Sequence, residues 1–485
     1  MNKNKQKFYI TTPIYYVNDR PHLGGAYTTL AADTFARYYR KKLGRENVFF
    51  LTGTDENSQK TIDAAAKAGL DVDQYLQGMV KQWRQTWDSL GITYDDFIRT
   101  TEDRHHKVVK NLAQKIYDNG DIFKGKYEGL YCKGCEAFLK ESDLDQDGNC
   151  PYHKAPPEVL SEDNYFFRLS EYQGRLLEFY DSHPDFLLPL SRRNEILSFI
   201  RSGLEDISIS REKAEIGISL PWDANHKMYV WFDALINYYS ALQEKSRENF
   251  WNSACHIIGK DITKFHCVIW PAMLMSAGIP LPQSIFAHGF FTIDGQKMSK
   301  TLRNTIYPLD ISRKYGNDAL RLGLLSAFEF GNDGDFSLSS FADFYRTRLA
   351  GGVGNLFNRV IVLLAKFLDG KKPKLEELEQ PLAREQEKIL ADFSQAMEEK
   401  KLFVAAAVLF SVLDRANLLL NESQVWTLAK NDLDAAQEIF AKLVMYLESV
   451  TKISETLLPE SVDKMKKMIG DSERVGKAEI LFPQV

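Results

Sequence analysis

The feature that most constrains the fold is a strand, a glycine loop and a helix that follow one another within the first 42 residues. Residues 8–11 (FYIT) have the pattern of a buried strand, which we expect Pro13 to end. After Pro21-His22-Leu23-Gly24-Gly25, apolar side chains recur with helical spacing over residues 27–42. Such a loop directs backbone N–H groups and the positive end of a helix dipole at a bound anion, and phosphate is the natural ligand. The alternative is an ordinary strand-to-helix turn, because short glycine motifs are weak signals.

Further strands alternate with helices, which predicts an α/β fold with a Rossmann-like, doubly wound parallel sheet. Residues 48–51 form a second buried strand that leads into Thr54-Asp55-Glu56 and then into a helix that ends near Gly69. Residues 255–258 and 285–287 read as later strands of the same sheet. Ligands of such sheets bind at the carboxyl ends of the strands, where Asp55 lies. Asp55 could instead be a helix cap.

Two short cysteine motifs predict a metal site in an insertion. Cys132 and Cys135 form one C-x-x-C pair, and Cys150 and His153 follow after 14 intervening residues. Two such turns suit tetrahedral zinc, and four protein ligands leave no open position, so we expect one structural Zn²⁺ per chain. The ion would stabilise a small lobe at about residues 120–160. A chance cluster or a redox pair is the alternative.

Residues 206–211 read as a strand, and two helical segments follow that each carry an aromatic face. Over residues 229–239 the spacing places Trp231, Ala234 and Tyr238 on one side. Over residues 262–275 it does the same for Ile262, His266 and Trp270. Plain core packing is the usual reason for such stripes.

Residues 294–301 (DGQKMSKT) place two lysines beside a serine just after a turn. Such cations on a mobile loop suit closure over a triphosphate, although a charged loop is commonly solvated surface.

Beyond residue 340 the pattern is wholly helical, with periodic segments at 341–368, 381–421 and 434–457. The tail, residues 472–485, contains Ile480-Leu481-Phe482 and could dock as an extended strand. The net charge of −5 requires any nucleic-acid contact to come from local basic patches. The start of the chain lacks a secretory signal, no apolar run has the length of a membrane span, and the five cysteines fit a reducing compartment. We therefore expect a cytoplasmic protein that does not enter a membrane.

Taken together, these motifs resemble a known family. Pro21-His22-Leu23-Gly24-Gly25 is similar to the HIGH motif of class I aminoacyl-tRNA synthetases, and Lys297-Met298-Ser299-Lys300-Thr301 is similar to their KMSKS motif. Further motifs narrow the resemblance to methionyl-tRNA synthetases. They are Thr12-Pro-Ile-Tyr-Tyr, Phe50-Leu-Thr-Gly-Thr-Asp-Glu, Trp231-Phe-Asp-Ala-Leu, Gly259-Lys-Asp-Ile with Phe265-His266, and Trp270-Pro-Ala-Met. The resemblance extends over residues 8–485.

The resemblance implies a domain order. Residues 1–119 and 201–285 would be the two halves of a Rossmann catalytic domain, separated by a connective insertion at 120–200 with the zinc motifs. Residues 286–340 would hold the KMSKS loop and the stem-contact region, and residues 341–485 an α-helical anticodon-binding domain.

It also implies an enzyme, a methionine–tRNA ligase that acts in translation initiation and elongation. Methionine and ATP would form methionyl-adenylate and pyrophosphate, and the methionyl group would then pass to tRNA(Met) with release of AMP. The substrate carboxylate is itself the nucleophile, so catalysis consists of positioning and charge stabilisation, with Mg²⁺ sharing the charge of ATP. The implied catalytic residues are His22, Lys297 and Lys300. The implied ATP-binding residues are Pro21, His22, Gly24, Gly25, Lys297, Met298, Ser299 and Lys300.

The remaining site residues are likewise implied by the resemblance. The methionine pocket would comprise Ile14, Tyr16, Asp55, Trp231, Ala234, Tyr238, Ile262, His266 and Trp270, with Asp55 pairing with the substrate ammonium. Arg211 and Asp261 would form a charged pair beside it. Asn355, Arg359 and Trp426 would read the anticodon, where Val425 replaces the family's usual proline. The chain stops after this helical region, so we expect a monomer.

Two rival readings stay open. Another class I synthetase, for leucine, isoleucine, valine or cysteine, is disfavoured because the insertion is too short for an editing domain and the zinc motifs lie outside the pocket. A non-catalytic tRNA-binding paralogue is suggested by Gly25, where the family usually has histidine.

Overall fold

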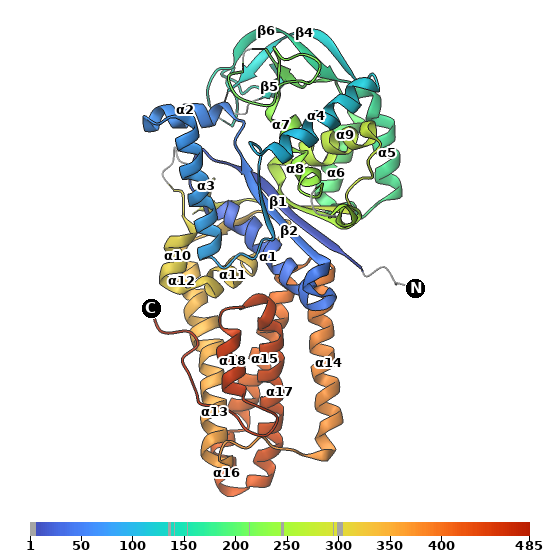
Figure 1. Ribbon diagram of the computed structural model, residues 1–485. Coiled ribbons are helices and arrows are strands. Elements are labelled where there is room, and N and C mark those ends of the chain that lie inside the picture. Colours follow the sequence, from blue (N-terminus) through green and yellow to red (C-terminus); the bar gives the residue numbers. More distant parts are fainter. Residues whose placement is uncertain are drawn as a thin grey trace. The chain divides into compact units, whose positions relative to one another are not determined.

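A computed structural model describes residues 6–133, 137–139, 141–152, 154–212, 214–243, 247–293, 295–297 and 304–485. The chain divides into two compact units (Figure 1). Unit 1 comprises residues 1–20, 47–85 and 94–287, and unit 2 comprises residues 21–46, 86–93 and 288–485. The domain limits expected from the sequence remain predictions.

Unit 1 is built on a six-stranded sheet, which confirms the predicted Rossmann-like fold. Its strand order is β3 (Asp96–Arg99), β2 (Val48–Asp55), β1 (Phe8–Tyr16), β11 (Ala254–Gly259), β12 (Ser284–His288) and β7 (Leu187–Leu188). The pairs β2–β3, β1–β2, β1–β11 and β7–β12 are parallel. Because the chain order reverses beside β1, the carboxyl ends of β1, β2 and β11 border the crevice where such sheets bind ligands.

The prediction that Pro13 ends the first strand is wrong. β1 continues to Tyr16, and its pairing with β2 shifts register between Thr11 and Ile14. Proline cannot donate a ladder hydrogen bond, and a local irregularity of this kind lets a strand continue past it.

Unit 1 also contains helices and a smaller antiparallel sheet in the insertion. The helices are α2 (Gln59–Ala68), α3 (Val72–Ser89), α4 (Asp103–Asp118), α5 (Gln173–Ser182), α6 (Leu190–Arg201), α7 (Val230–Ala234), α8 (Asn237–Ser240) and α9 (Trp270–Ala277). The insertion sheet has the order β5 (Ala137–Leu139), β4 (Ile122–Cys132), β6 (Glu158–Phe167) and β8 (Ile207–Ser208). A short ribbon joins β9 (Ser210–Arg211) to β10 (Lys227–Met228). The core combines sheet residues such as Tyr9 and Leu51 with Ile116 of α4 and Ala272 of α9.

The two aromatic helical segments are less regular than predicted. Residues 229–239 form α7 and α8 with a break between them. Residues 260–277 form a 3-10 turn (Lys260–Ile262), a π-helix (Phe265–Ile269) and only then α9. Both segments are helical as predicted, but neither is one regular α-helix.

Unit 2 begins with α1 (Leu23–Leu43), which starts one turn earlier than the periodic pattern suggests. A small sheet follows, with β13 (Phe291–Ile293), β14 (Gln296–Lys297) and β15 (Gly334–Phe336). The helices are α10 (Pro308–Tyr315), α11 (Asn317–Leu325), α12 (Leu338–Phe344), α13 (Asn355–Leu368), α14 (Glu376–Glu398), α15 (Leu402–Glu422), α16 (Val425–Asn431), α17 (Leu433–Leu457) and α18 (Val462–Ile469). A π-helix (Tyr345–Gly354) joins α12 to α13.

Helices α13 to α18 pack into a bundle, as Figure 1 shows, and this confirms the helical C-terminal region. The predicted segment 381–421 is two antiparallel helices, α14 and α15, because the chain reverses at Lys400, whose φ is +59°. The tail makes no regular strand among the described residues. It packs through buried Leu481 and Phe482, and the Tyr345 hydroxyl donates to the Pro483 carbonyl at 2.7 Å.

The prediction that no apolar run has the length of a membrane span is wrong. The helical stretches Leu338–Leu368 and Leu402–Glu422 are long and apolar enough to cross a membrane by length and composition alone. Both pack against other helices of the bundle, and core helices of bundles share this composition.

Candidate active site

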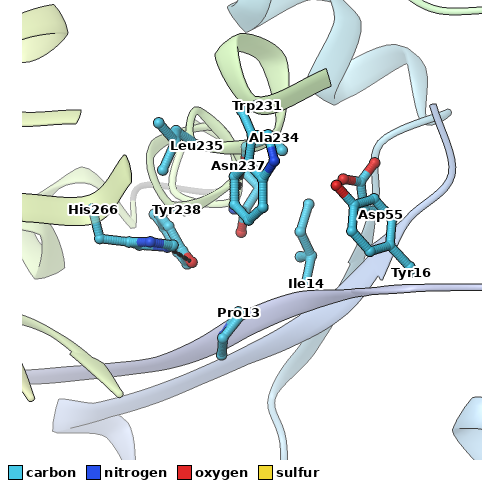
Figure 2. Close-up of a pocket in the computed structure, with 10 residues that line it drawn as sticks. All are labelled: Pro13, Ile14, Tyr16, Asp55, Trp231, Ala234, Leu235, Asn237, Tyr238 and His266. Carbon is cyan, nitrogen blue, oxygen red and sulfur yellow. Dashed lines mark hydrogen bonds between the residues drawn. The ribbon is translucent and has the colours of Figure 1, made fainter. Parts of the chain in front are cut away.

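A cavity in unit 1 lies above the carboxyl ends of β1 and β2 (Figure 2). Its lining residues come from β1 and β2 and from the segments around α7, α8 and the π-helix, and they are Pro13, Ile14, Tyr16, Asp55, Trp231, Ala234, Leu235, Asn237, Tyr238 and His266. Seven of the nine residues expected in the methionine pocket are among them. Figure 2 shows Asp55 and Tyr16 at one end, Tyr238 and His266 at the other, and Ile14 and Trp231 between them.

One end of the cavity carries the negative charge. Asp55, at the end of β2, is only 3% exposed, and the Asn57 backbone N–H donates to its Oδ1 at 3.3 Å. The Asn57 side chain donates to Oδ2 of a second buried carboxyl group, Asp233, at 3.1 Å. Burial and the nearby charge of Asp55 raise the pKa of Asp233. Two adjacent carboxyl groups favour one charge between them, so this end of the cavity suits a single cation.

The other end of the cavity is aromatic and contains a buried tyrosine–histidine pair. The Tyr238 hydroxyl lies 2.7 Å from His266 Nε2, and His266 Nδ1 lies 3.0 Å from the Ile262 carbonyl oxygen. A carbonyl only accepts, so Nδ1 carries the proton and Nε2 accepts from Tyr238. Burial lowers the pKa of His266 to about 4, which keeps the ring neutral.

Stacked rings fix the walls of this end. The Tyr238 ring stacks on His256 with centroids 4.2 Å apart, and Trp231 stacks on Phe265 at 4.0 Å. The Tyr9 hydroxyl donates to the Tyr238 carbonyl at 2.8 Å and so ties α8 to β1. A soft, unbranched thioether side chain suits such walls.

Ile262 and Trp270 were expected in the pocket but do not line it among the described residues. An α-helix would place them on the His266 face, whereas the π-helix inserts a wider turn in which the Trp270 N–H donates to the Phe265 carbonyl. Trp270 consequently packs behind Tyr238, with centroids 6.4 Å apart, and is fully buried. Ile262 contributes through its carbonyl, which sets the His266 tautomer.

Pro13, Leu235 and Asn237 line the cavity although the sequence did not single them out. Pro13 belongs to the irregular part of β1, and the other two lie at the break between α7 and α8. Only irregular backbone brings them to the cavity, and a periodic pattern does not reveal it.

The predicted support pair lies on two separate segments of unit 1. Arg211 donates to the Ser208 hydroxyl at 3.0 Å and to the Ser210 carbonyl at 2.7 Å, and its guanidinium lies 4.8 Å from the Tyr229 ring centroid. Asp261 lies in the 3-10 turn before the π-helix. Their pairing stays a prediction.

The metal prediction is tested only in part by the described residues. Cys132, at the end of β4, and Cys150 are both buried, whereas Cys135 and His153 lie outside the described residues. Within the described ranges, no group of three or more potential ligands comes together. Three thiols and an imidazole remain a donor set typical of structural zinc.

In unit 2, His22 is the N-cap of α1, and its Nδ1 accepts from the Gly24 N–H at 3.1 Å. Leu23 N–H donates to the Ile306 carbonyl at 2.9 Å, and Gly25 is buried in the first helical turn. The N–H groups of Leu23 and Gly24 thus have partners within unit 2, and binding of an anion at this helix end stays a prediction. Lys297 lies at the end of β14, while Met298, Ser299 and Lys300 lie outside the described residues.

Two of the three predicted anticodon residues meet in the bundle. The Arg359 guanidinium lies 5.7 Å from the Trp426 ring centroid, and Arg359 also donates to Asn421 Oδ1 at 3.3 Å. Asn355 is exposed one turn before Arg359 on α13. A cation over an indole ring next to an amide is an arrangement that suits unstacked bases.

A family model described as "tRNA synthetases class I (M)" matches residues 8–158 and 152–361. The fold and both sequence motifs thus define a class I tRNA synthetase.

Curated relatives show which family within this class the chain resembles. The methionine–tRNA ligase of Caldanaerobacter subterraneus is 39% identical over 99% of this chain and 79% of its own length. That of Thermosynechococcus vestitus is 43% identical over 93% of this chain and 87% of its own. The methionyl-tRNA synthetase of Mycobacterium tuberculosis in complex with methionyl-adenylate superposes with a TM-score of 0.91 at 35% identity, covering 99% of this chain and 100% of the other. The chain belongs to the methionine–tRNA ligase family.

Proposed function

We propose that the chain is an enzyme that attaches methionine to tRNA(Met) in an ATP-dependent reaction through methionyl-adenylate. The observation that carries this proposal is the cavity of unit 1, which has one charged end at Asp55 and one aromatic end at Tyr238 and His266. The Asp55 carboxylate receives the substrate ammonium, and the aromatic end receives the thioether.

The aromatic end supports selection of the side chain. Trp231 and Ile14 line the middle of the cavity, between the charged end and Tyr238. Since the Tyr238 proton is engaged by His266, the hydroxyl oxygen and the ring faces form the surface that meets the substrate sulfur. A branched side chain would meet Trp231, and a short one would leave the aromatic end unfilled.

In the first step the methionine carboxylate oxygen attacks the α-phosphorus of ATP, the bond to the bridging oxygen breaks, and pyrophosphate leaves with the electron pair. In the second step the 3′-terminal hydroxyl of tRNA attacks the carbonyl of methionyl-adenylate, and AMP leaves. No protein nucleophile is needed, so His22, Lys297 and Lys300 act by binding and stabilising phosphate charge. Pro21, Gly24, Gly25, Met298 and Ser299 complete the ATP site. The Mg²⁺ that accompanies ATP would supply further positive charge to the triphosphate.

Asn355, Arg359 and Trp426 read the tRNA anticodon. The product, methionyl-tRNA, serves both initiation and elongation of translation. Cys132, Cys135, Cys150 and His153 hold one structural Zn²⁺. We further propose a monomeric, cytoplasmic protein that does not enter a membrane. The contacts that both long apolar helices make with other helices of the bundle support that last point.

Pyrophosphate exchange tests the proposal directly. Purified, zinc-replete protein should catalyse ATP–pyrophosphate exchange with methionine and at least 100-fold less with isoleucine or cysteine. Exchange that is absent with methionine, in protein that binds tRNA(Met), would instead support the non-catalytic paralogue. Exchange that prefers another amino acid would refute the assignment of the pocket.

A further inference from the structure

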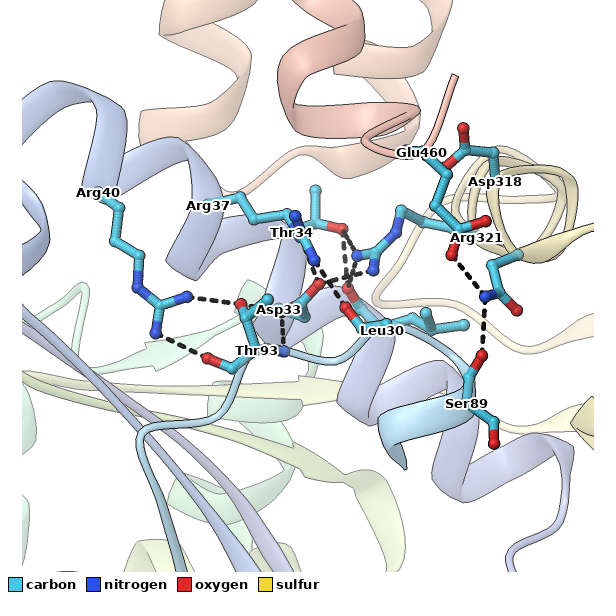
Figure 3. A network of polar contacts seen from close by, with 12 residues as sticks. Leu30, Asp33, Thr34, Arg37, Arg40, Ser89, Thr93, Asp318, Arg321 and Glu460 are labelled. Atoms are coloured by element: carbon cyan, nitrogen blue, oxygen red, sulfur yellow. Dashed lines mark hydrogen bonds and ion pairs between the residues drawn. The ribbon is translucent and has the colours of Figure 1, made fainter. Parts of the chain in front are cut away.

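Helix α11 of unit 2 contains a buried arginine that joins it to the middle of α1 (Figure 3). Arg321 is 1% exposed, and its Nη2 lies 2.6 Å from Oδ2 of Asp33, which is fully buried. Its Nη1 donates to the Thr34 hydroxyl at 3.0 Å and to the Leu30 carbonyl at 3.3 Å. One guanidinium therefore contacts a full turn of α1.

Asp33 is surrounded by further donors that fix its orientation. Arg37 Nε lies 2.7 Å from Oδ2, and the backbone N–H and hydroxyl of Thr93 donate to Oδ1 at 2.7 and 2.5 Å. Arg40 in turn donates to the Thr93 carbonyl at 2.8 Å. Burial alone would raise the pKa of Asp33, but the adjacent guanidiniums and the Thr93 hydroxyl lower it, so the carboxylate stays ionised.

The first turn of α11 holds the end of the longest bundle helix. Asp318 accepts from the backbone N–H groups of Glu460 at 3.1 Å and Ser461 at 2.7 Å, in the turn between α17 and α18. The Asn317 side chain donates to Glu460 Oε1 at 2.6 Å and to the Ser89 carbonyl at 2.8 Å. α11 thus contacts the bundle with one turn and α1 with the next.

Stability alone is a poor reason for such a pair. Replacing a buried ion pair by well-packed apolar side chains is often neutral or stabilising, whereas the pair fixes direction and distance closely. The element that it fixes is α1, whose N-cap is His22, and Asp33 lies about three turns along the same helix. Few changes at Asp33 could therefore leave His22 unmoved.

We propose that Arg321 is a positioning residue for adenylate formation, which holds α1 and hence His22 in place through α11. This inference rests on the proposed function, because it assumes that His22 contacts the ATP phosphates. Arg321 itself touches no substrate. Asp318 joins the bundle to the same helix, α11.

The test uses a double variant, Asp33→Asn with Arg321→Met, which removes both charges of the buried pair, while the partly exposed Arg37 keeps its hydrogen bond to the Gly91 carbonyl. We expect kcat for ATP–pyrophosphate exchange, normalised to active sites counted by adenylate formation, to fall at least tenfold. The Kd for methionine, measured by tryptophan fluorescence, should stay within twofold of the wild type. Lys41→Met is the matched control, because Lys41 also lies on α1 and pairs with Glu455 of α17, but at the surface; its kcat should change less than twofold.

Equal loss of methionine binding and normalised kcat, or an unchanged kcat, would overturn the inference. If the double variant does not melt cooperatively, Arg321→Lys replaces it, since it keeps the charge but not the fork of donors. That variant should lower kcat at least threefold with unchanged methionine affinity, and wild-type kcat in it would likewise overturn the inference. Absence of exchange in the wild-type protein would count against the proposed function instead.

Discussion

The Tyr238–His266 pair allows a sharp test of the pocket through the substitution Tyr238→Phe. The ring would keep its stack on His256, so little packing is lost, and the change is confined to one hydroxyl group. His266 Nε2 would lose its donor at 2.7 Å, while Nδ1 remains bound to the Ile262 carbonyl. A buried acceptor left without a donor costs about 1–3 kcal/mol.

That cost should appear in folding, whereas binding loses only the contact between the hydroxyl and the substrate sulfur, because the unpaired acceptor is present with and without methionine. The free energy of unfolding, from urea titration at pH 7.5, should fall by about 1–3 kcal/mol. The Kd for methionine should rise by roughly 2- to 12-fold from the lost contact with the sulfur, since one such contact contributes about 0.5–1.5 kcal/mol and 1.4 kcal/mol corresponds to tenfold. Norleucine, which has a methylene in place of sulfur, should bind with nearly unchanged affinity, so the variant should discriminate less between the two.

Tyr239→Phe is the control, because Tyr239 is adjacent, half-buried and absent from the described lining of the cavity. It should change methionine affinity by less than twofold. Wild-type stability together with wild-type methionine affinity in Tyr238→Phe would refute the assignment of Tyr238 as the donor to His266.

Three further outcomes follow from the same structure. Asp55→Asn should raise KM for methionine at least roughly 30-fold, because losing one member of a buried charge pair costs about 2–5 kcal/mol; steady-state exchange measures it, and an unchanged KM would contradict the ammonium assignment. Trp426→Ala should weaken tRNA charging by about 1–3 kcal/mol in kcat/KM while leaving exchange intact, and an equal loss in both assays would be evidence against anticodon reading. Burial lowers the pKa of His266 and His288 to about 4, below the value near 6.5 in the unfolded chain. As the pH falls from 6.5 toward 4, the unfolded chain binds these protons first, so each residue should lower the free energy of unfolding by about 1.4 kcal/mol per pH unit. Urea unfolding at pH 7, 6 and 5 measures this slope, and greater stability at pH 5 than at pH 7 would show that these rings are not buried neutral.

Regular elements of the fold could be predicted because their side-chain periodicity survives in the structure. The strand at residues 255–258 and the helix at 434–457 appear as β11 and α17 almost at the predicted limits. Asp55 could be placed at the ligand-binding edge because a parallel sheet puts the last residue of β2 there.

Irregular backbone could not be predicted in the same way. The strand pattern gave no sign that β1 continues past Pro13, although this continuation brings Ile14 and Tyr16 to the cavity. Helical periodicity did not reveal the π-helix between Ile262 and Trp270, because it assumes 3.6 residues per turn throughout. The role of Arg321 could not be predicted from the sequence, because its partner, Asp33, lies 288 residues away along the chain.

The π-helix Tyr345–Gly354 makes the orientation of side chains on the following helix, α13, depend on the number of residues in this segment. It leads directly into α13, and the Asn355 N–H donates to the carbonyls of Ala350 and Gly352. Each residue of an α-helix turns the following side chains by about 100°, so deleting one residue here would carry Asn355 and Arg359 around the helix axis, away from Trp426. A substitution at Ala350 should therefore be tolerated more readily than an insertion or deletion, whereas a Cβ at Gly351 would lie 2.9 Å from the Arg346 carbonyl oxygen.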